Sequence, residues 1–388
     1  MGFERLTAYM DSLAERYGVP GADLKITRGY ETVYRYSVGY SDYALTRPVS
    51  PDDVYNIYSG SKPITMAGVM QLVEQGKLGL EDRLDKYLPE FAHMRYAADF
   101  KFGVFPFRWP DENSDLREAK KPMLIRDCMS MTAGMSYDLT AAPIRRTLEK
   151  NPKAGTRELV RAMAEMPLLC EPGTHYSYSL SHDVLAAVVE VVTGQRFADY
   201  MREHIFEPLG IERMYYHVPD REKPHLADQY AQDWDTLEIR RDGSMDYRFS
   251  ENYDSGGAGL ATSVNEYSKF IAAMANGGVG ATGERILKPE SIDLMRRNWL
   301  NETELKDFIL PGKPGYGYGL GVRTLIDASQ SKSPVGEFGW DGAAGCFILI
   351  DPENQIGLFY AQEILGMLSS YGEIHPAIRD LAYECMGL

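Results

Sequence analysis

The sequence has few of the features that mark metal sites, membrane spans or nucleic-acid binding. Its four cysteines, at positions 128, 170, 346 and 385, show no Cys-x-x-Cys spacing, and its seven histidines form no His-x-x-x-His or Cys/His cluster. A metal site is therefore not expected. The sequence contains no apolar run of the roughly 18 residues that a transmembrane helix needs. The formal net charge of −15 disfavours nucleic acid and anionic membranes as partners, since both need basic patches.

The N-terminus also lacks the pattern of a secretory signal. Residues 1–13 are charged and amphipathic and contain no apolar core. We therefore expect a cytoplasmic protein, although a chain from which a signal had been trimmed would look the same. With 388 residues, 44% hydrophobic and 25% charged, the chain is long enough for one large two-part unit or two domains.

A hydroxyl and an amine lie one helical turn apart in Ser59-Gly60-Ser61-Lys62. Apolar residues at helical spacing follow them, and Gly76 can end the helix. Because residues three apart share one face of a helix, Lys62 could take the proton of Ser59 once burial lowers the pKa of its amine. This segment predicts a serine nucleophile with a lysine base.

The Ser-x-x-Lys spacing alone is expected about once by chance in a chain of this length. A second copy, Ser329-Gln330-Ser331-Lys332, runs into Ser333-Pro334 within a polar stretch that has no apolar periodicity. That pattern predicts a loop. The context of the motif therefore favours Ser59 over Ser329 as the nucleophile.

The order of helical and strand patterns predicts an α/β (α+β) fold. Strands are expected at 23–27, 33–39, 316–324, 345–350 and 356–362, and helices up to about residue 16, after Ser59, and at 183–192, 265–275 and 374–386. Strands near both ends suggest one sheet built from residues 1–91 and 256–388, with a mainly helical region, 92–255, inserted. The active site would lie between these two parts.

Residues 92–122 form an irregular stretch that is rich in aromatic residues and proline. The stretch could cover a pocket or pack against the surface, and both interpretations stay open. Its main aromatic residues are Phe100, Phe102, Phe105, Phe107 and Trp109.

The order of motifs along nearly the whole chain resembles the serine β-lactamase-like superfamily, which includes class C β-lactamases, DD-peptidases and carboxylesterases of the same fold. The resemblance implies a β-lactamase/transpeptidase-like fold, an antiparallel sheet flanked by helices, and an acyl-enzyme mechanism without a cofactor. The segments that match are 59–62 with its helix to residue 78, 84–91, 124–135, 172–174, 178–179, 257–260 and 338–345.

In this family the second motif is Tyr-x-Asn, and it falls on residues 178–180. The resemblance implies that Tyr178 relays a proton among Ser59, Lys62 and the leaving group, provided that the nearby ammonium lowers the pKa of its phenol. Tyr176 is the competing register. Leu180 replaces the asparagine that would bind a substrate amide, and leucine can neither donate nor accept a hydrogen bond. This departure argues against β-lactam and peptide substrates and favours esters.

The third motif, Lys-Thr-Gly in the family, is represented here by Trp340-Asp341-Gly342. Gly342 is expected to leave room for substrate along its strand. The resemblance places the oxyanion hole at the backbone N–H groups of Ser59 and Ala343. Trp340 has no positive charge with which to bind a substrate carboxylate, and Asp341 would repel one. Trp-x-Gly at this place resembles the carboxylesterase branch.

Four further residues have both a functional and an ordinary structural interpretation. His175 and His182 flank Tyr178 and could support it or be plain structural histidines. Cys346 is expected to be a buried structural thiol, and Asp183 to belong to the start of its helix.

The sequence therefore predicts a serine hydrolase that acts on a small-molecule ester or amide, first of all a carboxylesterase of small or apolar acyl esters. An amidase or D-amino-acid peptidase, a β-lactamase, and a binding module with a decayed site remain the alternatives. The oligomeric state cannot be predicted from the sequence.

Overall fold

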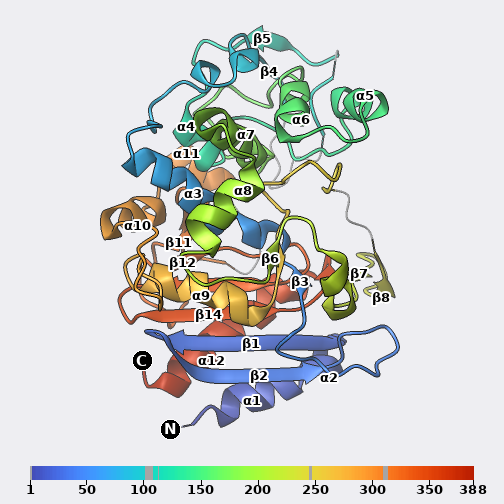
Figure 1. The fold of residues 1–388 in the computed structure, drawn as a ribbon, viewed down its shortest axis with the longest axis vertical. Helices are drawn as coiled ribbons and strands as arrows, with labels where there is room; N and C mark the ends of the chain where they lie inside the picture. Colours follow the sequence, from blue (N-terminus) through green and yellow to red (C-terminus); the bar gives the residue numbers. More distant parts are fainter. Residues whose placement is uncertain (1, 101–107, 112, 244–246, 309–312) are drawn as a thin grey trace.

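The largest element of the molecule is an antiparallel sheet that joins the two ends of the chain (Figure 1). The computed structural model describes residues 2–100, 108–111, 113–243, 247–308 and 313–388. The strand order is β10-β11-β12-β13-β14-β1-β2, and all neighbouring strands pair antiparallel. Strands β1 (Gly21–Arg28) and β2 (Glu31–Gly39) come from the N-terminal part and the other five from the C-terminal part. The predicted fold class is confirmed.

The single strand predicted at residues 316–324 is wrong, because the structure has two short strands there. Residues 316–324 form two strands, β10 (Tyr316–Tyr318) and β11 (Arg323–Leu325), which pair with each other. Gly321 has a φ of +78°, a left-handed conformation that turns the chain between them. The remaining strands of the sheet are β12 (Phe338–Gly339), β13 (Phe347–Asp351) and β14 (Ile356–Ala361).

Helices cover both faces of this sheet (Figure 1). Helix α9 (Val264–Ala275) packs against β14, β1 and β13 on one face. On the other face lie α1 (Glu4–Asp11), α2 (Leu13–Tyr17) and α12 (His375–Met386). Because successive side chains of a strand point to opposite faces of the sheet, the strands contribute to two hydrophobic cores. Ile348 belongs to the core between the sheet and α9, and Leu349 to the core between the sheet and α12.

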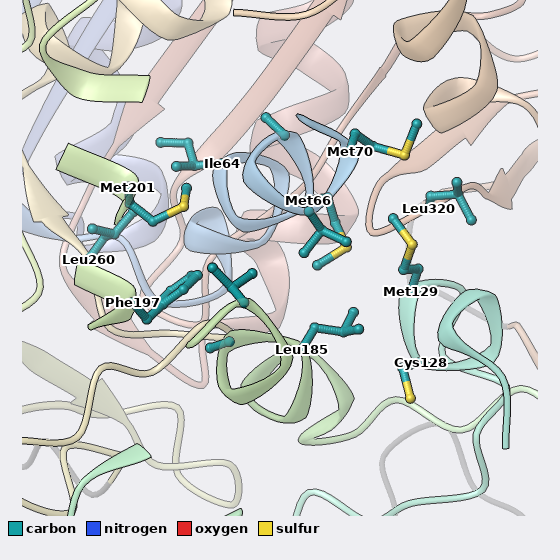
Figure 2. Packing of buried hydrophobic residues seen from close by; sticks show 14 of the residues in the cluster. Ile64, Met66, Met70, Cys128, Met129, Leu185, Phe197, Met201, Leu260 and Leu320 are labelled. Carbon is teal, nitrogen blue, oxygen red and sulfur yellow. The ribbon is translucent and has the colours of Figure 1, made fainter. Parts of the chain in front are cut away.

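Helix α3 (Lys62–Glu74), which follows Ser59, is the centre of the helical half. Because it is buried on nearly all sides, its apolar residues are not confined to one stripe. Figure 2 shows Met66 and Met70 of α3 among side chains from the neighbouring helices, including Met129, Leu185 and Met201. The helices of this half are α4 (Ile125–Met129), α5 (Ala142–Lys150), α6 (Thr156–Met163), α7 (Ser181–Thr193) and α8 (Phe197–Met201).

Smaller elements complete the described chain. Helices α10 (Pro289–Arg296) and α11 (Glu302–Asp307) precede β10. Among the described residues, no helix is long and apolar enough to cross a membrane. The short strands are β3 (Tyr55–Asn56), β6 (Met214–Tyr215) and β9 (Ala261–Thr262) in one sheet, β7 (Tyr230–Gln232), β8 (Ile239–Arg241) and β15 (Ile364–Leu365) in another, and β4 (Arg95–Ala97) with β5 (Leu116–Glu118) in a third. Single helical turns are η1 (Tyr58–Ser61), η2 (Leu84–Lys86), η3 (Pro89–Phe91), η4 (Arg202–Phe206), η5 (Asp220–His225) and η6 (Ser370–Ile374).

The aromatic-rich stretch is described only in part. Phe102, Phe105 and Phe107 lie outside the described residues. Trp109 is buried, and its indole N–H donates a hydrogen bond to the Asp138 carbonyl at 3.1 Å. The role of residues 92–122 as a cover, and the division of the chain at residues 91 and 255, stay predictions.

Candidate active site

Ser59 lies in the helical turn η1, which runs directly into α3. The residue before it, Tyr58, has a φ of +46°, a strained conformation for a side chain of this size. The turn is fixed by hydrogen bonds from the Ser61 hydroxyl to the Tyr58 carbonyl and from the Tyr267 phenol to the Gly60 carbonyl, at 2.7 and 2.6 Å. A rigid turn thus presents the Ser59 hydroxyl, and this residue remains 9% exposed.

Lys62 places its amine beside this hydroxyl. The side chain is fully buried, and Nζ lies 3.2 Å from Ser59 Oγ and 2.8 Å from the Gly257 carbonyl oxygen. Burial lowers the pKa of Lys62 from 10.5 to about 7, because the ammonium loses its hydration. Near neutral pH the amine is therefore available as a base.

Tyr178 approaches Ser59 from the other side. Its phenol donates a hydrogen bond to Ser59 Oγ at 2.7 Å and accepts one from Trp340 Nε1 at 3.1 Å. Burial raises the pKa of Tyr178 above its ordinary value, although the hydrogen bonds with Ser59 and Trp340 act in the opposite sense. The condition stated for the relay, a pKa of Tyr178 lowered by the nearby ammonium, is not met, because lost hydration outweighs the hydrogen bonds that favour the phenolate. The phenol of Tyr178 is therefore protonated near neutral pH, and its role in proton transfer stays a prediction.

The structure separates the two tyrosines that compete for this role. The Tyr176 ring packs edge-to-face against Phe308 and Tyr318, with centroids 5.0 and 5.3 Å apart, so it belongs to an aromatic cluster. The side chain of Leu180 packs into the main hydrophobic core and is 2% exposed. Of Tyr176 and Tyr178, it is thus Tyr178 that lies beside Ser59, and the substrate-binding role of Leu180 stays a prediction.

The segment 340–343 packs directly against the residues that precede Ser59. A β carbon on Gly342 would lie 2.3 Å from the Ile57 carbonyl oxygen and 2.6 Å from Cys346 Sγ. Glycine is therefore required for backbone packing, and the expected room for substrate along this strand stays a prediction. The Tyr371 phenol lies 2.9 Å from the carbonyl oxygens of both Gly342 and Ala343. This packing supports the predicted oxyanion hole at Ser59 and Ala343, which stays a prediction.

Asp341 is engaged by cations of the protein itself. Its carboxylate lies 2.9 Å from Lys313 Nζ and 3.2 Å from Arg323 Nη1. Burial opposes ionisation, but the charges of Arg323 and Lys313 outweigh it and hold the pKa of Asp341 below its usual value. The expected repulsion of a substrate carboxylate by Asp341 is therefore offset by two neighbouring positive charges.

Tyr137 is a site residue that sequence reasoning missed. Its ring stacks on Tyr178 with centroids 5.3 Å apart and an interplanar angle of 6°. Lys62 Nζ lies 5.3 Å from the Tyr137 ring centroid. Nothing in its local sequence, Gly134-Met135-Ser136-Tyr137, carries a catalytic pattern, so no signal could have identified it.

The other candidates have structural partners. His175 Nδ1 lies 2.8 Å from an Asp307 carboxylate oxygen. His182 is fully buried with Nε2 3.2 Å from the Met129 carbonyl oxygen. Cys346 is a buried free thiol whose pKa burial raises, as expected for a structural cysteine. Ser329 lies in an exposed turn, away from any buried partner of the kind that Ser59 has.

The arrangement can perform acyl transfer by a serine. A hydroxyl lies between an amine that can be neutral near pH 7 and a phenol that remains protonated, so one neighbour can remove a proton and the other can donate one. Among the described residues, no group of three or more His, Cys, Asp or Glu side chains is placed to hold a metal ion.

Comparisons with known proteins agree with this chemistry. The Beta-lactamase family model matches residues 6–383. Esterase EstB of Burkholderia gladioli is 26% identical over 414 residues, covering 98% of this chain and 94% of that protein. A lovastatin esterase of Penicillium rubens is 28% identical over 340 residues, covering 80% and 79%. The solved structure of EstCE1, a hydrolase with promiscuous acyltransferase activity, is 25% identical, covers 98% of both chains and has a TM-score of 0.79.

Proposed function

This chain belongs to the beta-lactamase family, and from that premise we propose that it is a serine hydrolase of the carboxylesterase type that acts on small or apolar acyl esters. The observation that supports the proposal best is the position of Ser59 Oγ between Lys62 Nζ and the Tyr178 phenol. The esterases among its relatives support the same reaction class.

In the proposed acylation step, Ser59 Oγ attacks the ester carbonyl carbon while neutral Lys62 takes its proton. The oxyanion that forms would accept hydrogen bonds from the N–H groups of Ser59 and Ala343. As the carbon–oxygen bond to the alcohol breaks, Tyr178 donates its phenolic proton to the leaving oxygen and recovers a proton from the Lys62 ammonium. Water then attacks the acyl carbon and gives a proton to the same amine. As the bond from that carbon to Ser59 Oγ breaks, the Lys62 ammonium returns this proton to Ser59 Oγ, which releases the acid and restores free Ser59 and the neutral amine.

Two features favour esters without a carboxylate near the scissile bond. Trp340 takes the place of the family lysine, and its one polar hydrogen is already donated to Tyr178. Lys313, a cation close to this segment, is 4% exposed and paired with Asp341. Neither group is placed to bind the carboxylate that β-lactams and D-alanyl peptides carry.

Hydrolysis of p-nitrophenyl butyrate by the purified protein tests the proposal. Ser59→Ala should lower turnover by about a thousandfold or more, because the nucleophile is removed. Ser329→Ala is the matched control, since it removes the exposed serine of the second Ser-x-x-Lys segment and should leave turnover unchanged. Equal turnover in wild type and Ser59→Ala would refute the nucleophile, and faster cleavage of D-alanyl anilides than of esters would favour an amidase.

Acyl transfer to an alcohol is a second candidate, because EstCE1 combines both activities. The same acyl-enzyme would be released by an alcohol in place of water. Adding butanol to the butyrate assay should then yield butyl butyrate, measured by gas chromatography, in excess of the Ser59→Ala control. Butyrate as the sole product would restrict the enzyme to hydrolysis under these conditions.

A further inference from the structure

Asp183 is a buried carboxylate beside the catalytic group that the mechanism above does not use. It lies in the first turn of α7 and is 1% exposed. Its Oδ1 accepts hydrogen bonds from the Tyr253 phenol at 2.7 Å and from the Ser255 hydroxyl at 2.6 Å. Two donors on one oxygen stabilise the anionic form of a carboxylate that would otherwise be costly to bury.

The second oxygen, Oδ2, faces Lys62 across bare backbone. It is buried, and no described side chain donates a hydrogen bond to it. A β carbon on Gly257 would lie 2.6 Å from Oδ2 and 3.4 Å from Lys62 Nζ. The Gly257 carbonyl in turn accepts the hydrogen bond from Lys62 at 2.8 Å. Gly257 therefore separates the carboxylate from the amine without a side chain between them.

We propose that Asp183 is a positioning residue for the base, whose negative charge stabilises the ammonium that Lys62 becomes when it takes the proton of Ser59. The inference rests on the proposed function, in which Lys62 is that base. In a site removed from water, a fixed opposite charge nearby favours the charged product of proton transfer. Asp183 does not touch the substrate and acts through Lys62.

The other titratable groups around Lys62 are neutral near pH 7. On α7, His182 is fully buried, and burial holds its pKa well below the ordinary value. Burial raises the pKa of the three nearby phenols, those of Tyr137, Tyr178 and Tyr253. Burial also raises the pKa of Asp183, against the effect of Ser255, Tyr253 and Lys62. Among these described groups, Asp183 is thus the one that can supply a negative charge to the amine.

The test is the pH dependence of Ser59 labelling by a fluorophosphonate probe, which reports the nucleophile whatever the natural substrate. In wild type the labelling rate should rise as Lys62 loses its proton near pH 7, and this rise is the ascending limb of the pH profile. Asp183→Asn keeps the Oδ1 acceptor and removes the charge. It should move this limb down by about one to two pH units and lower the plateau by about three- to tenfold, since a less basic amine is a weaker base.

Asp351→Asn is the matched control. Asp351 is also fully buried and accepts a tyrosine hydrogen bond, from Tyr383 at 2.7 Å. It should leave the limb where it is in wild type. Ser255→Ala removes one of the donors that favour the ionised form of Asp183, so the carboxylate is less readily ionised and the limb should move in the same direction as in Asp183→Asn and by less. This variant decides the question if Asp183→Asn does not fold.

The outcomes separate this inference from the proposed function. A limb that stays at the wild-type pH in the folded variants overturns the role of Asp183 while leaving Ser59 as the nucleophile. An equal shift in Asp351→Asn would also overturn it, because any buried charge would then have the same effect. If wild type is labelled no faster than Ser59→Ala, the proposed function itself fails.

Discussion

At the scale of single residues, the indole of Trp340 decides where the phenolic proton of Tyr178 points. An indole N–H can only donate a hydrogen bond, so the Tyr178 oxygen must accept at 3.1 Å. The phenolic hydrogen is then left to point at Ser59 Oγ, 2.7 Å away. The contact that Trp340 makes in the site is thus one that orients the Tyr178 phenol and carries no charge.

Trp340→Phe is therefore expected to slow turnover without removing a group that transfers protons. Loss of one buried hydrogen bond of about 1 kcal/mol should lower kcat for p-nitrophenyl butyrate by about two- to tenfold. In a Tyr178→Phe background the same substitution should have no further effect, because the acceptor is gone. Trp299→Phe is the control, since its indole donates to the Leu294 backbone carbonyl. Additive losses in the double variant would contradict an orienting role.

At the scale of elements, the segment after β12 is held by a buried ion network. Arg323 of β11 is fully buried and reaches Glu337 at 3.4 Å, Asp341 at 3.2 Å and the Ile348 carbonyl of β13 at 2.9 Å. These contacts tie β11 and β13 to Asp341 and to Glu337, the residue before β12. Buried ion pairs add little net stability but become costly when one partner is removed.

Asp341→Asn should therefore act mainly on stability. Arg323 and Lys313 would lose a carboxylate that each contacts, and the free energy of unfolding should fall by about 2–4 kcal/mol. Urea unfolding measures this change, with the exposed Asp327→Asn as control. If Asp341 instead served to repel substrates, its replacement would leave stability unchanged and bring hydrolysis of carboxylate-bearing esters.

The elements also show what sequence patterns can and cannot predict. The patterns located the helix after Ser59, the sheet strands at both ends and the C-terminal helix, since each has a long local periodicity. The split of residues 316–324 was missed because a glycine turn inside an apolar run leaves that periodicity nearly unchanged. Tyr137 could not be found, and Asp183 was expected only to belong to the start of its helix, because the contacts of both side chains are with residues far away in the chain.

At the scale of the whole molecule, the site lies where the helical half meets the sheet half. Lys62 and Tyr178 come from the segments around α3 and α7, and Trp340 follows β12 (Figure 1). The family resemblance spans the segments that hold these residues, and in the structure Ser59, Tyr178 and Trp340 are linked by hydrogen bonds, while their action as a catalytic site stays a prediction. Distances, burial and the pKa of Tyr178 depend on how these segments pack, which the order of motifs does not contain.

The packing that activates Lys62 should also destabilise the fold. Its pKa is about 7 in the folded protein and 10.5 for a hydrated lysine of the unfolded chain, so between these values the unfolded chain binds more protons. The resulting penalty on folding is complete below about pH 7 and vanishes above about pH 10.5. Lys62→Met removes the amine while keeping a long apolar side chain, so it should raise the free energy of unfolding even though it abolishes activity.

The pH dependence of this gain distinguishes the ionisation of Lys62 from a general packing effect. The advantage of Lys62→Met over wild type should be about 2 kcal/mol smaller at pH 9 than at pH 7, because wild type regains stability as the unfolded chain loses its extra proton. Urea unfolding at both pH values measures it. Ser59→Ala, equally inactive but with the amine in place, should show no such trend. An advantage that is the same at both pH values would mean that Lys62 is as easily protonated in the folded protein as in the unfolded chain, and a lysine of that kind could not serve as the base for Ser59 near neutral pH.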